Sequence, residues 1–232
     1  MGVKKLARTQ VKKAYDILNN YKMLNRIIAS YFGVKISGNI GFETFYAIII
    51  ENQSWLSLLN VFIDMDNTLA HFSNGKIDDG SVLEKAILEG FFENLPIMDD
   101  YINIYEALAC IGVNIYILSA CMNTLYCRKE KRIWLNKYMP WIKQKQIILC
   151  NVGENKSKIA LTKANIESLE HSILIDDYKE NLLNWLIAGG YAIKKAISYK
   201  PNRPYPTLIN HKEAIDLILG TGLSIIKIKI EA

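Results

Sequence analysis

Apolar and charged positions near the start of the chain follow the period of a helix. Between residues 4 and 31 the apolar side chains recur every three or four positions, and the charged side chains fall on the opposite face. This pattern predicts one amphipathic helix over residues 4–31. Glycines at positions 33, 38 and 41 interrupt the pattern, and the apolar stretch within residues 42–60 receives no assignment.

From residue 61 onwards the pattern changes to short β-rich runs that alternate with helical segments. The runs typical of strands cover residues 61–64, 114–118, 146–150, 172–176 and 191–193. The helical segments cover residues 81–91, 99–111, 127–138, 156–169, 179–188 and 211–219. Such alternation predicts a Rossmann-like α/β fold, with a parallel sheet of about five strands and helices on both faces. In residues 226–230 isoleucines alternate with lysines, which predicts a half-exposed edge strand.

Composition and charge narrow the class of protein. Half of the residues are hydrophobic and 22% are charged, as in ordinary globular proteins. The net charge is +5, but residues 1–40 hold eight basic residues against Asp16 alone, a net charge of +7, so residues 41–232 carry −2. The chain is therefore not basic throughout, which argues against a general nucleic-acid-binding protein.

The predicted N-terminal helix has several candidate roles. Its apolar face favours packing on the rest of the domain or on a second copy of the chain, which would give a homodimer. Its basic face is also compatible with an acidic partner or a membrane surface. No segment approaches the roughly 18 apolar residues of a membrane span, and neither a signal peptide nor a CxxC pair is visible. We therefore expect a cytoplasmic protein without a membrane span.

Polar and charged side chains gather where the predicted strands end. In an open parallel sheet, ligands bind outside the carboxyl ends of the strands, so residues at these positions are expected to lie close together. Burying bare carboxylates there would be costly unless a cation neutralised them. The residues concerned are Asp64 and Asp66 at the end of the first strand, Ser119 at the end of the second, Lys156 and Lys158 between the third and fourth, and Asp176 and Asp177 at the end of the fourth.

Side chains of these types suit phosphoryl transfer assisted by a metal. Clustered oxygen ligands, without nitrogen or sulfur, are the donors that Mg²⁺ prefers. One carboxylate can attack a phosphorus atom to form an acyl phosphate, and a second can protonate the leaving oxygen and later deprotonate water. The hydroxyl, the ammonium and the metal can bind the phosphoryl oxygens and offset the developing charge. Metal-assisted phosphoryl transfer is the reaction class that uses all of these groups.

The sequence around these residues resembles the haloacid dehalogenase-like superfamily. Four segments are similar to its four motifs, in order, and further stretches extend the resemblance to about residues 59–200. The closer likeness is to the 5′(3′)-deoxyribonucleotidase family and related nucleotidase-like proteins. The motif segments are VFIDMDNTLAHF (61–72), YILSA (116–120), NKSK (155–158) and ILIDDYKEN (173–181), and the further stretches are GFFENLPIMDD (90–100), RIWLNKYMP (132–140) and NLLNWLIAGGYAIK (181–194).

The resemblance implies a role for each motif residue. Asp64 would be the nucleophile, and Asp66 would be the general acid and base. The binding residues implied in the same way are Asp64, the backbone carbonyl of Asp66, Asp176 and Asp177 for Mg²⁺, and Ser119 with Lys156, or Lys158 in its place, for phosphate.

The resemblance also implies a small helical cap, at about residues 71–111, that selects the substrate. Phe91 and Phe92 are candidates to stack on a base, and packing in the core of the cap is the alternative role of these rings. The chain is expected to divide into a basic helical extension, residues 1–58, and a phosphatase domain, residues 59–232.

The implied function is that of a Mg²⁺-dependent 5′-nucleotidase. Such an enzyme releases phosphate from nucleoside or deoxynucleoside monophosphates through a phosphoaspartyl intermediate, so its partner is a small-molecule phosphate ester. One alternative is a phosphatase for another small phosphate ester or for a nucleic-acid end. A second alternative is a non-catalytic binding protein on the same fold, against which the intact Asp64 and Asp66 argue.

Overall fold

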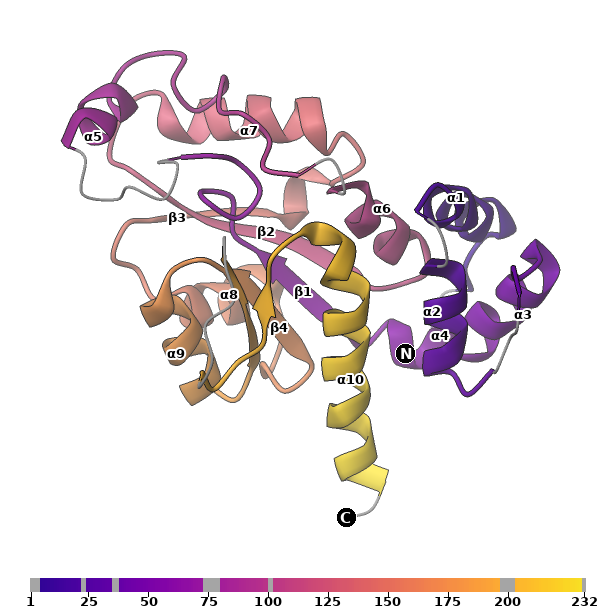
Figure 1. Ribbon diagram of the computed structural model, residues 1–232. Coiled ribbons are helices and arrows are strands. Elements are labelled where there is room, and N and C mark those ends of the chain that lie inside the picture. Colours follow the sequence, from indigo (N-terminus) through magenta and orange to yellow (C-terminus); the bar gives the residue numbers. More distant parts are fainter. Residues whose placement is uncertain are drawn as a thin grey trace.

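A computed structural model describes residues 5–21, 24–34, 38–72, 80–99, 102–196 and 203–230. Its centre is a parallel sheet with the strand order β3-β2-β1-β4-β5-β6. Figure 1 labels strands β1 to β4 of this sheet. The predicted α/β fold is confirmed, although the sheet has six strands rather than about five. The strands are β1 Asn60–Ile63, β2 Asn114–Cys121, β3 Ile147–Asn151, β4 Ser172–Asp176, β5 Tyr191–Lys195 and β6 Thr207–Leu208.

Helices cover both faces of the sheet. On β1, Val61 and Ile63 contribute to one apolar core and Phe62 contributes to another on the opposite face. Strands buried on both faces need consecutive apolar residues, which explains why β1 and β4 lack polar–apolar alternation. The helices of the first face are α6 Asn103–Cys110, α7 Cys127–Tyr138 and α10 Ala214–Ile230, and those of the second are α8 Lys156–Ala164 and α9 Lys179–Ile187.

The strand register places the polar residues at one edge. Ile63 at the end of β1 is level with Ile117 on β2 and with Ile175 on β4. Asp64 follows Ile63 directly, and its N–H donates to the carbonyl oxygen of Ile175 at 2.9 Å. The next residue of β4, Asp176, therefore ends its strand beside Asp64.

The predicted single helix over residues 4–31 is wrong, because the structure has two. The first ends at Asn19, whose side-chain oxygen accepts a hydrogen bond from the amide of Asn25 at 2.7 Å. Asparagine side chains compete with the helical backbone for hydrogen bonds, so they favour an end at this point. The apolar stripe continues across the break, which is why its period suggested one helix. The N-terminal helices are α1 Arg8–Asn19, α2 Leu24–Tyr31, α3 Phe42–Glu51 and α4 Gln53–Leu56.

The N-terminal helices pack onto the first face of the domain. Helix α1 contacts α6, and its fully buried Val11, Ala14 and Leu18 belong to the same apolar core as Ile63. The basic face of α1 is paired within the chain: Arg8 with Glu43, Lys12 with Asp16, and Lys13 with Glu106 at 2.6 Å. These contacts are those expected of an accessory helix, whereas an acidic partner and a homodimer stay predictions.

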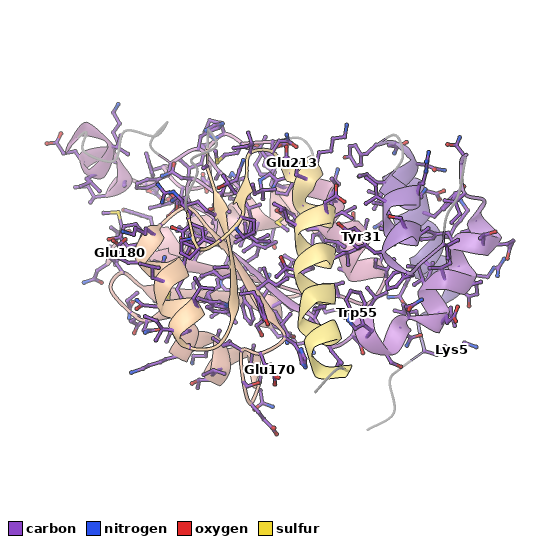
Figure 2. All side chains as sticks on the ribbon, turned by 60° about the horizontal axis from the view of Figure 1, so that its bottom comes forward. Lys5, Tyr31, Trp55, Glu170, Glu180 and Glu213 are labelled. Carbon is purple, nitrogen blue, oxygen red and sulfur yellow. The ribbon has the colours of Figure 1, made fainter. Side chains whose placement is uncertain are left out.

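The predicted edge strand over residues 226–230 is also wrong, because α10 continues as a helix to Ile230. A helix that is already formed extends with little further cost, so a five-residue alternation does not stop it. Figure 2 shows α10 between the strands and the N-terminal helices, with Tyr31 and Trp55 on that side. The hydroxyl of Tyr31 donates to the carbonyl oxygen of Asp216 at 3.0 Å, and Gly222 lets Leu59 and Trp55 approach closely. In the described part of the chain, no helix has both the length and the apolar character needed to cross a bilayer.

Candidate active site

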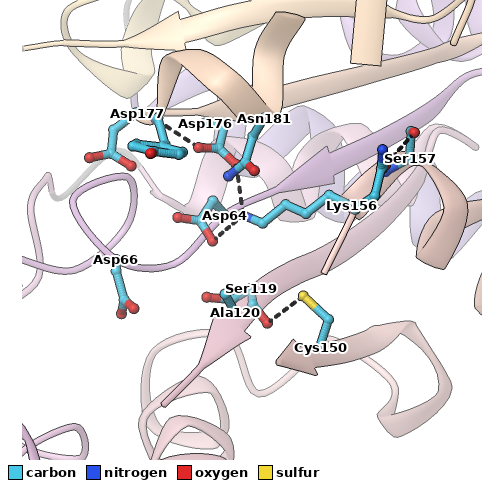
Figure 3. Close-up of polar contacts among 12 residues, drawn as sticks. Asp64, Asp66, Ser119, Ala120, Cys150, Lys156, Ser157, Asp176, Asp177 and Asn181 are labelled. Atoms are coloured by element: carbon cyan, nitrogen blue, oxygen red, sulfur yellow. Dashed lines mark hydrogen bonds and ion pairs between the residues drawn. The ribbon is translucent and has the colours of Figure 1, made fainter. Parts of the chain in front are cut away.

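Three carboxylates meet at the carboxyl ends of the central strands. Asp64 follows β1, and Asp176 and Asp177 stand at the end of β4 (Figure 3). Each offers one oxygen atom, and these oxygens all lie within 4.8 Å of one another. Asp176 is fully buried and Asp64 is nearly so. Like charges this close repel strongly in a buried site, so the cluster requires cations nearby.

Lys156 supplies one of these cations. Its Nζ atom donates to Asp64 Oδ1 at 2.8 Å and to Asp176 Oδ2 at 2.7 Å. It stands at the first position of α8, where the side chain of Asn155 caps the helix. Burial opposes the charged form of Lys156, but the two carboxylates outweigh burial and raise its pKa. The structure brings Lys156 into the cluster, whereas Lys158 lies on the exposed side of the same helix.

A second buried lysine, Lys131 on α7, was not singled out from the sequence. Its Nζ atom donates to Asp66 Oδ2 at 2.6 Å, to Ser119 Oγ at 3.0 Å and to the carbonyl oxygen of Ala120 at 2.6 Å. Lys131 is fully buried, and it shares a helix face with the buried Cys127 and Leu135, four residues on either side. A lysine on the apolar stripe of a helix is the signal that could have identified it.

The two carboxylate oxygens of Asp66 have different surroundings. Lys131 binds Oδ2, while Oδ1 has no hydrogen-bond partner within the described residues. Burial raises the pKa of Asp66, Lys131 opposes that rise, and the charge of Asp64 adds to it. A raised pKa keeps a carboxylic acid protonated at higher pH, which is the state that can donate a proton.

A pocket of about 590 Å³ opens above these groups. Asp64, Asp66 and Lys156 line it near the strand ends, and the loop before α8 and the start of α9 line it further out. The outer side chains include a largely exposed tyrosine and valine, two carboxylates and three amides. They are Val152, Glu154, Asn155, Tyr178, Glu180, Asn181 and Asn184.

The two phenylalanines of the predicted cap pack against other aromatic rings. Phe92 is 1% exposed, and its ring lies 6.0 Å from that of Phe72 and 5.1 Å from that of Phe91, between centroids. Among the described residues that line the pocket, neither Phe91 nor Phe92 occurs. Parts of the predicted cap, residues 73–79 and 100–101, lie outside the described residues. Base stacking by these rings therefore stays a prediction.

The loop after Asp64 is held by a buried histidine from the C-terminal part of the chain. Nε2 of His211 donates to the carbonyl oxygen of Thr68 at 2.9 Å, since a carbonyl can only accept. Nδ1 must then accept from the hydroxyl of Tyr105, 2.6 Å away. Burial and the charge of Lys195 lower the pKa of His211 to about 4, with Asp99 acting in the opposite direction. The histidine is therefore neutral in the folded protein near pH 7.

We expect His211 to make stability depend on pH. Below about pH 6.5 the histidine of the unfolded chain is protonated, whereas in the folded chain it stays neutral until about pH 4. Protonation therefore favours the unfolded state, and stability is lost as the pH falls. Between pH 7 and pH 4.5 the His211→Gln variant should lose about 2–3 kcal/mol less unfolding free energy than the wild type. Urea unfolding across this range measures the difference. The half-buried His171, changed to glutamine, serves as the control, and parallel profiles for wild type and His211→Gln would contradict the expectation.

Comparison with solved structures identifies the fold. A haloacid dehalogenase-like family hydrolase from Xanthomonas campestris is similar over 74% of this chain and 94% of its own, with a TM-score of 0.53 and 11% identity. A HAD-superfamily hydrolase from Ehrlichia chaffeensis is similar over 71% of this chain and 97% of its own, with a TM-score of 0.50 and 15% identity. No protein-family model and no curated protein matches the sequence. The chain therefore has the fold of the haloacid dehalogenase-like hydrolases.

Proposed function

We propose that this protein is a Mg²⁺-dependent phosphomonoesterase that forms a phosphoaspartyl intermediate at Asp64. The observation that carries the proposal is a pair of lysine-centred units at one edge of the sheet. In the first, Lys156 joins Asp64 to Asp176, and in the second, Lys131 joins Asp66 to Ser119. One unit is suited to attack on phosphorus, and the other is suited to proton transfer beside it.

The carboxylate cluster fits Mg²⁺. Burial and the neighbouring charges of Asp64 and Asp176 raise the pKa of Asp177 to about 7, a measure of the repulsion that a cation would relieve. Asp64, Asp176 and Asp177 offer only hard oxygen donors, and the backbone carbonyl of Asp66 is a further candidate. When bound, the metal would neutralise the negative charge that develops on the phosphoryl group.

The residues of the chain account for both halves of the reaction. The carboxylate of Asp64 attacks the phosphorus atom, and the bond from phosphorus to the leaving oxygen breaks while Asp66 donates a proton to that oxygen. Asp66 then accepts a proton from water, the water oxygen attacks phosphorus, and the bond to Asp64 breaks to release phosphate. In this proposal Lys156, which lines the pocket beside Asp64, binds a phosphoryl oxygen. Ser119, the other predicted phosphate ligand, is fully buried and accepts a hydrogen bond from Lys131, which also holds Asp66.

The pocket supports a nucleoside monophosphate as the substrate. Its volume of about 590 Å³ lies within the range of small-molecule sites. In the described lining, Lys156 is the sole cation and lies beside Asp64, so the outer walls suit an uncharged group. The exposed ring of Tyr178 can stack on a base, and the amides of Asn155 and Asn184 can bond to base or sugar.

A substrate panel tests this function. With Mg²⁺, the purified protein should release phosphate from nucleoside and deoxynucleoside monophosphates with a kcat/KM at least about tenfold above that for sugar phosphates and 3′-phosphorylated oligonucleotides. p-Nitrophenyl phosphate serves as a minimal ester. Higher activity on a sugar phosphate or a nucleic-acid end would contradict the nucleotidase assignment. No release from any ester would contradict the phosphatase itself and favour a binding protein.

A further inference from the structure

Next to the lysine that holds Asp66 stands a buried carboxylate that the reaction does not use. Glu130, on α7, is 2% exposed. Its Oε1 atom accepts the N–H of Gly90 at 2.6 Å, and its Oε2 atom accepts the N–H of Phe92 at 3.0 Å. Both carboxylate oxygens of Glu130 therefore bind backbone N–H groups of a single turn, which lies 38 to 40 residues away in the sequence.

A second contact from α7 fixes the end of the same turn. The indole N–H of Trp134 donates to the carbonyl oxygen of Leu95 at 2.7 Å. Trp134 is fully buried and stands one helical turn after Glu130, on the same side of the helix. Three hydrogen bonds thus tie residues 90–95 to the helix that carries Lys131.

The turn held by Glu130 places an aromatic ring on the ammonium of Lys131. The ring centroid of Phe92 lies 5.3 Å from the Nζ atom of Lys131. The three N–H groups of this ammonium point at Asp66, Ser119 and Ala120, so the ring is a further neighbour of the charge rather than a hydrogen-bond partner. The attraction between a cation and a ring face grows when water is excluded, and Lys131 is fully buried.

We propose that Glu130 is a positioning residue for the reaction, which acts through Phe92 and Lys131 on Asp66. By fixing the turn at Gly90–Phe92, its carboxylate keeps the ring on the ammonium and keeps water away from the Lys131 end of the Lys131–Asp66 ion pair. Without this anchor the turn shifts, water reaches the ammonium, and Asp66 is held less firmly. This inference rests on the proposed phosphatase function.

The test compares Glu130→Gln with Glu89→Gln. A glutamine keeps the shape but can accept only one of the two N–H groups. Glu89 stands in the same loop and is exposed, so its variant makes the same charge change without touching the anchor. With p-nitrophenyl phosphate and Mg²⁺, Glu130→Gln should lower kcat about tenfold and leave KM within about twofold, because the loss falls on the chemical step. Glu89→Gln should behave as the wild type.

A double-mutant cycle separates positioning from mere stability. Phe92→Leu removes the ring that covers the ammonium, so Glu130→Gln should lower kcat little further in that background. Hydrogen exchange should show the amides of Gly90 and Phe92 protected in the wild type and exchanging at least about tenfold faster in Glu130→Gln.

Several outcomes would overturn the proposal. Multiplicative losses in the double variant, or a wild-type kcat for a folded Glu130→Gln, would leave Glu130 with a structural role only. If Glu130→Gln does not fold, Glu130→Asp takes its place, since the shorter carboxylate cannot reach both N–H groups. A wild type that hydrolyses no ester would refute the proposed function, whereas an active wild type with an unchanged variant refutes this inference alone.

Discussion

Replacing Asp64 by asparagine should abolish phosphate release, with kcat lowered by about 10⁴-fold or more. The amide has the same shape but is not a nucleophile, so no acyl phosphate can form. Its oxygen can still accept the hydrogen bond that Lys156 donates at 2.8 Å, so the fold should persist. Phosphate release at saturating substrate measures the effect, and circular dichroism checks the fold.

A matched control and a chemical trap make this result specific. Asp16→Asn is the same change at an exposed residue that pairs with Lys12 on α1, and it should leave kcat unchanged. Acid quenching of the wild type during turnover, followed by mass spectrometry, should find phosphate on the peptide that contains Asp64. Full activity in Asp64→Asn, or label on another residue, would rule out Asp64 as the nucleophile.

Lys156→Met should give the second large effect. The change leaves Asp64 and Asp176 without the cation that bridges them, and breaking a buried ion pair in this way costs about 3–5 kcal/mol of unfolding free energy. It also removes a charge placed to bind a phosphoryl oxygen, so kcat/KM should fall by at least about 100-fold. Thermal unfolding and steady-state kinetics measure the two losses.

Lys158 provides the control for this substitution. It lies two residues further along α8 but is exposed, so Lys158→Met should leave both stability and kcat/KM close to the wild type. Mg²⁺ should stabilise Lys156→Met more than the wild type, because the variant lacks the ammonium that bridges Asp64 and Asp176. The reverse ranking of the two lysines would show that the wrong one has been placed in the site.

The cluster around Asp64 could be predicted from the sequence because parallel strands align their carboxyl ends. Once residues 61–64 and 172–176 are recognised as strands, their last residues must share an edge, and Asp64 and Asp176 do so. Lys131 could not be predicted in the same way. It reaches Asp66 from the middle of α7, so its position depends on how that helix packs rather than on where a strand ends.

Errors in the predicted elements have a related cause. Local period described the apolar stripe correctly on both sides of Asn19, but it could not show that a helix ends there. In residues 226–230 the alternation predicted a strand, and it could not show that α10 continues through this segment. The hydrogen bond between Asn19 and Asn25 lies where α1 gives way to α2. Helix α10 packs against Tyr31 and Leu59, which are distant from it in the sequence.

The sequence by itself determined the α/β class, the strand ends and the acidic edge, because alternation of strands and helices leaves few ways to bury their apolar faces. The tertiary structure alone decided which lysine faces the acids, that Lys131 and Glu130 are buried side by side, and that Phe92 covers an ammonium. These features depend on contacts between residues 38 to 92 positions apart, and such contacts cannot be predicted from the local sequence pattern.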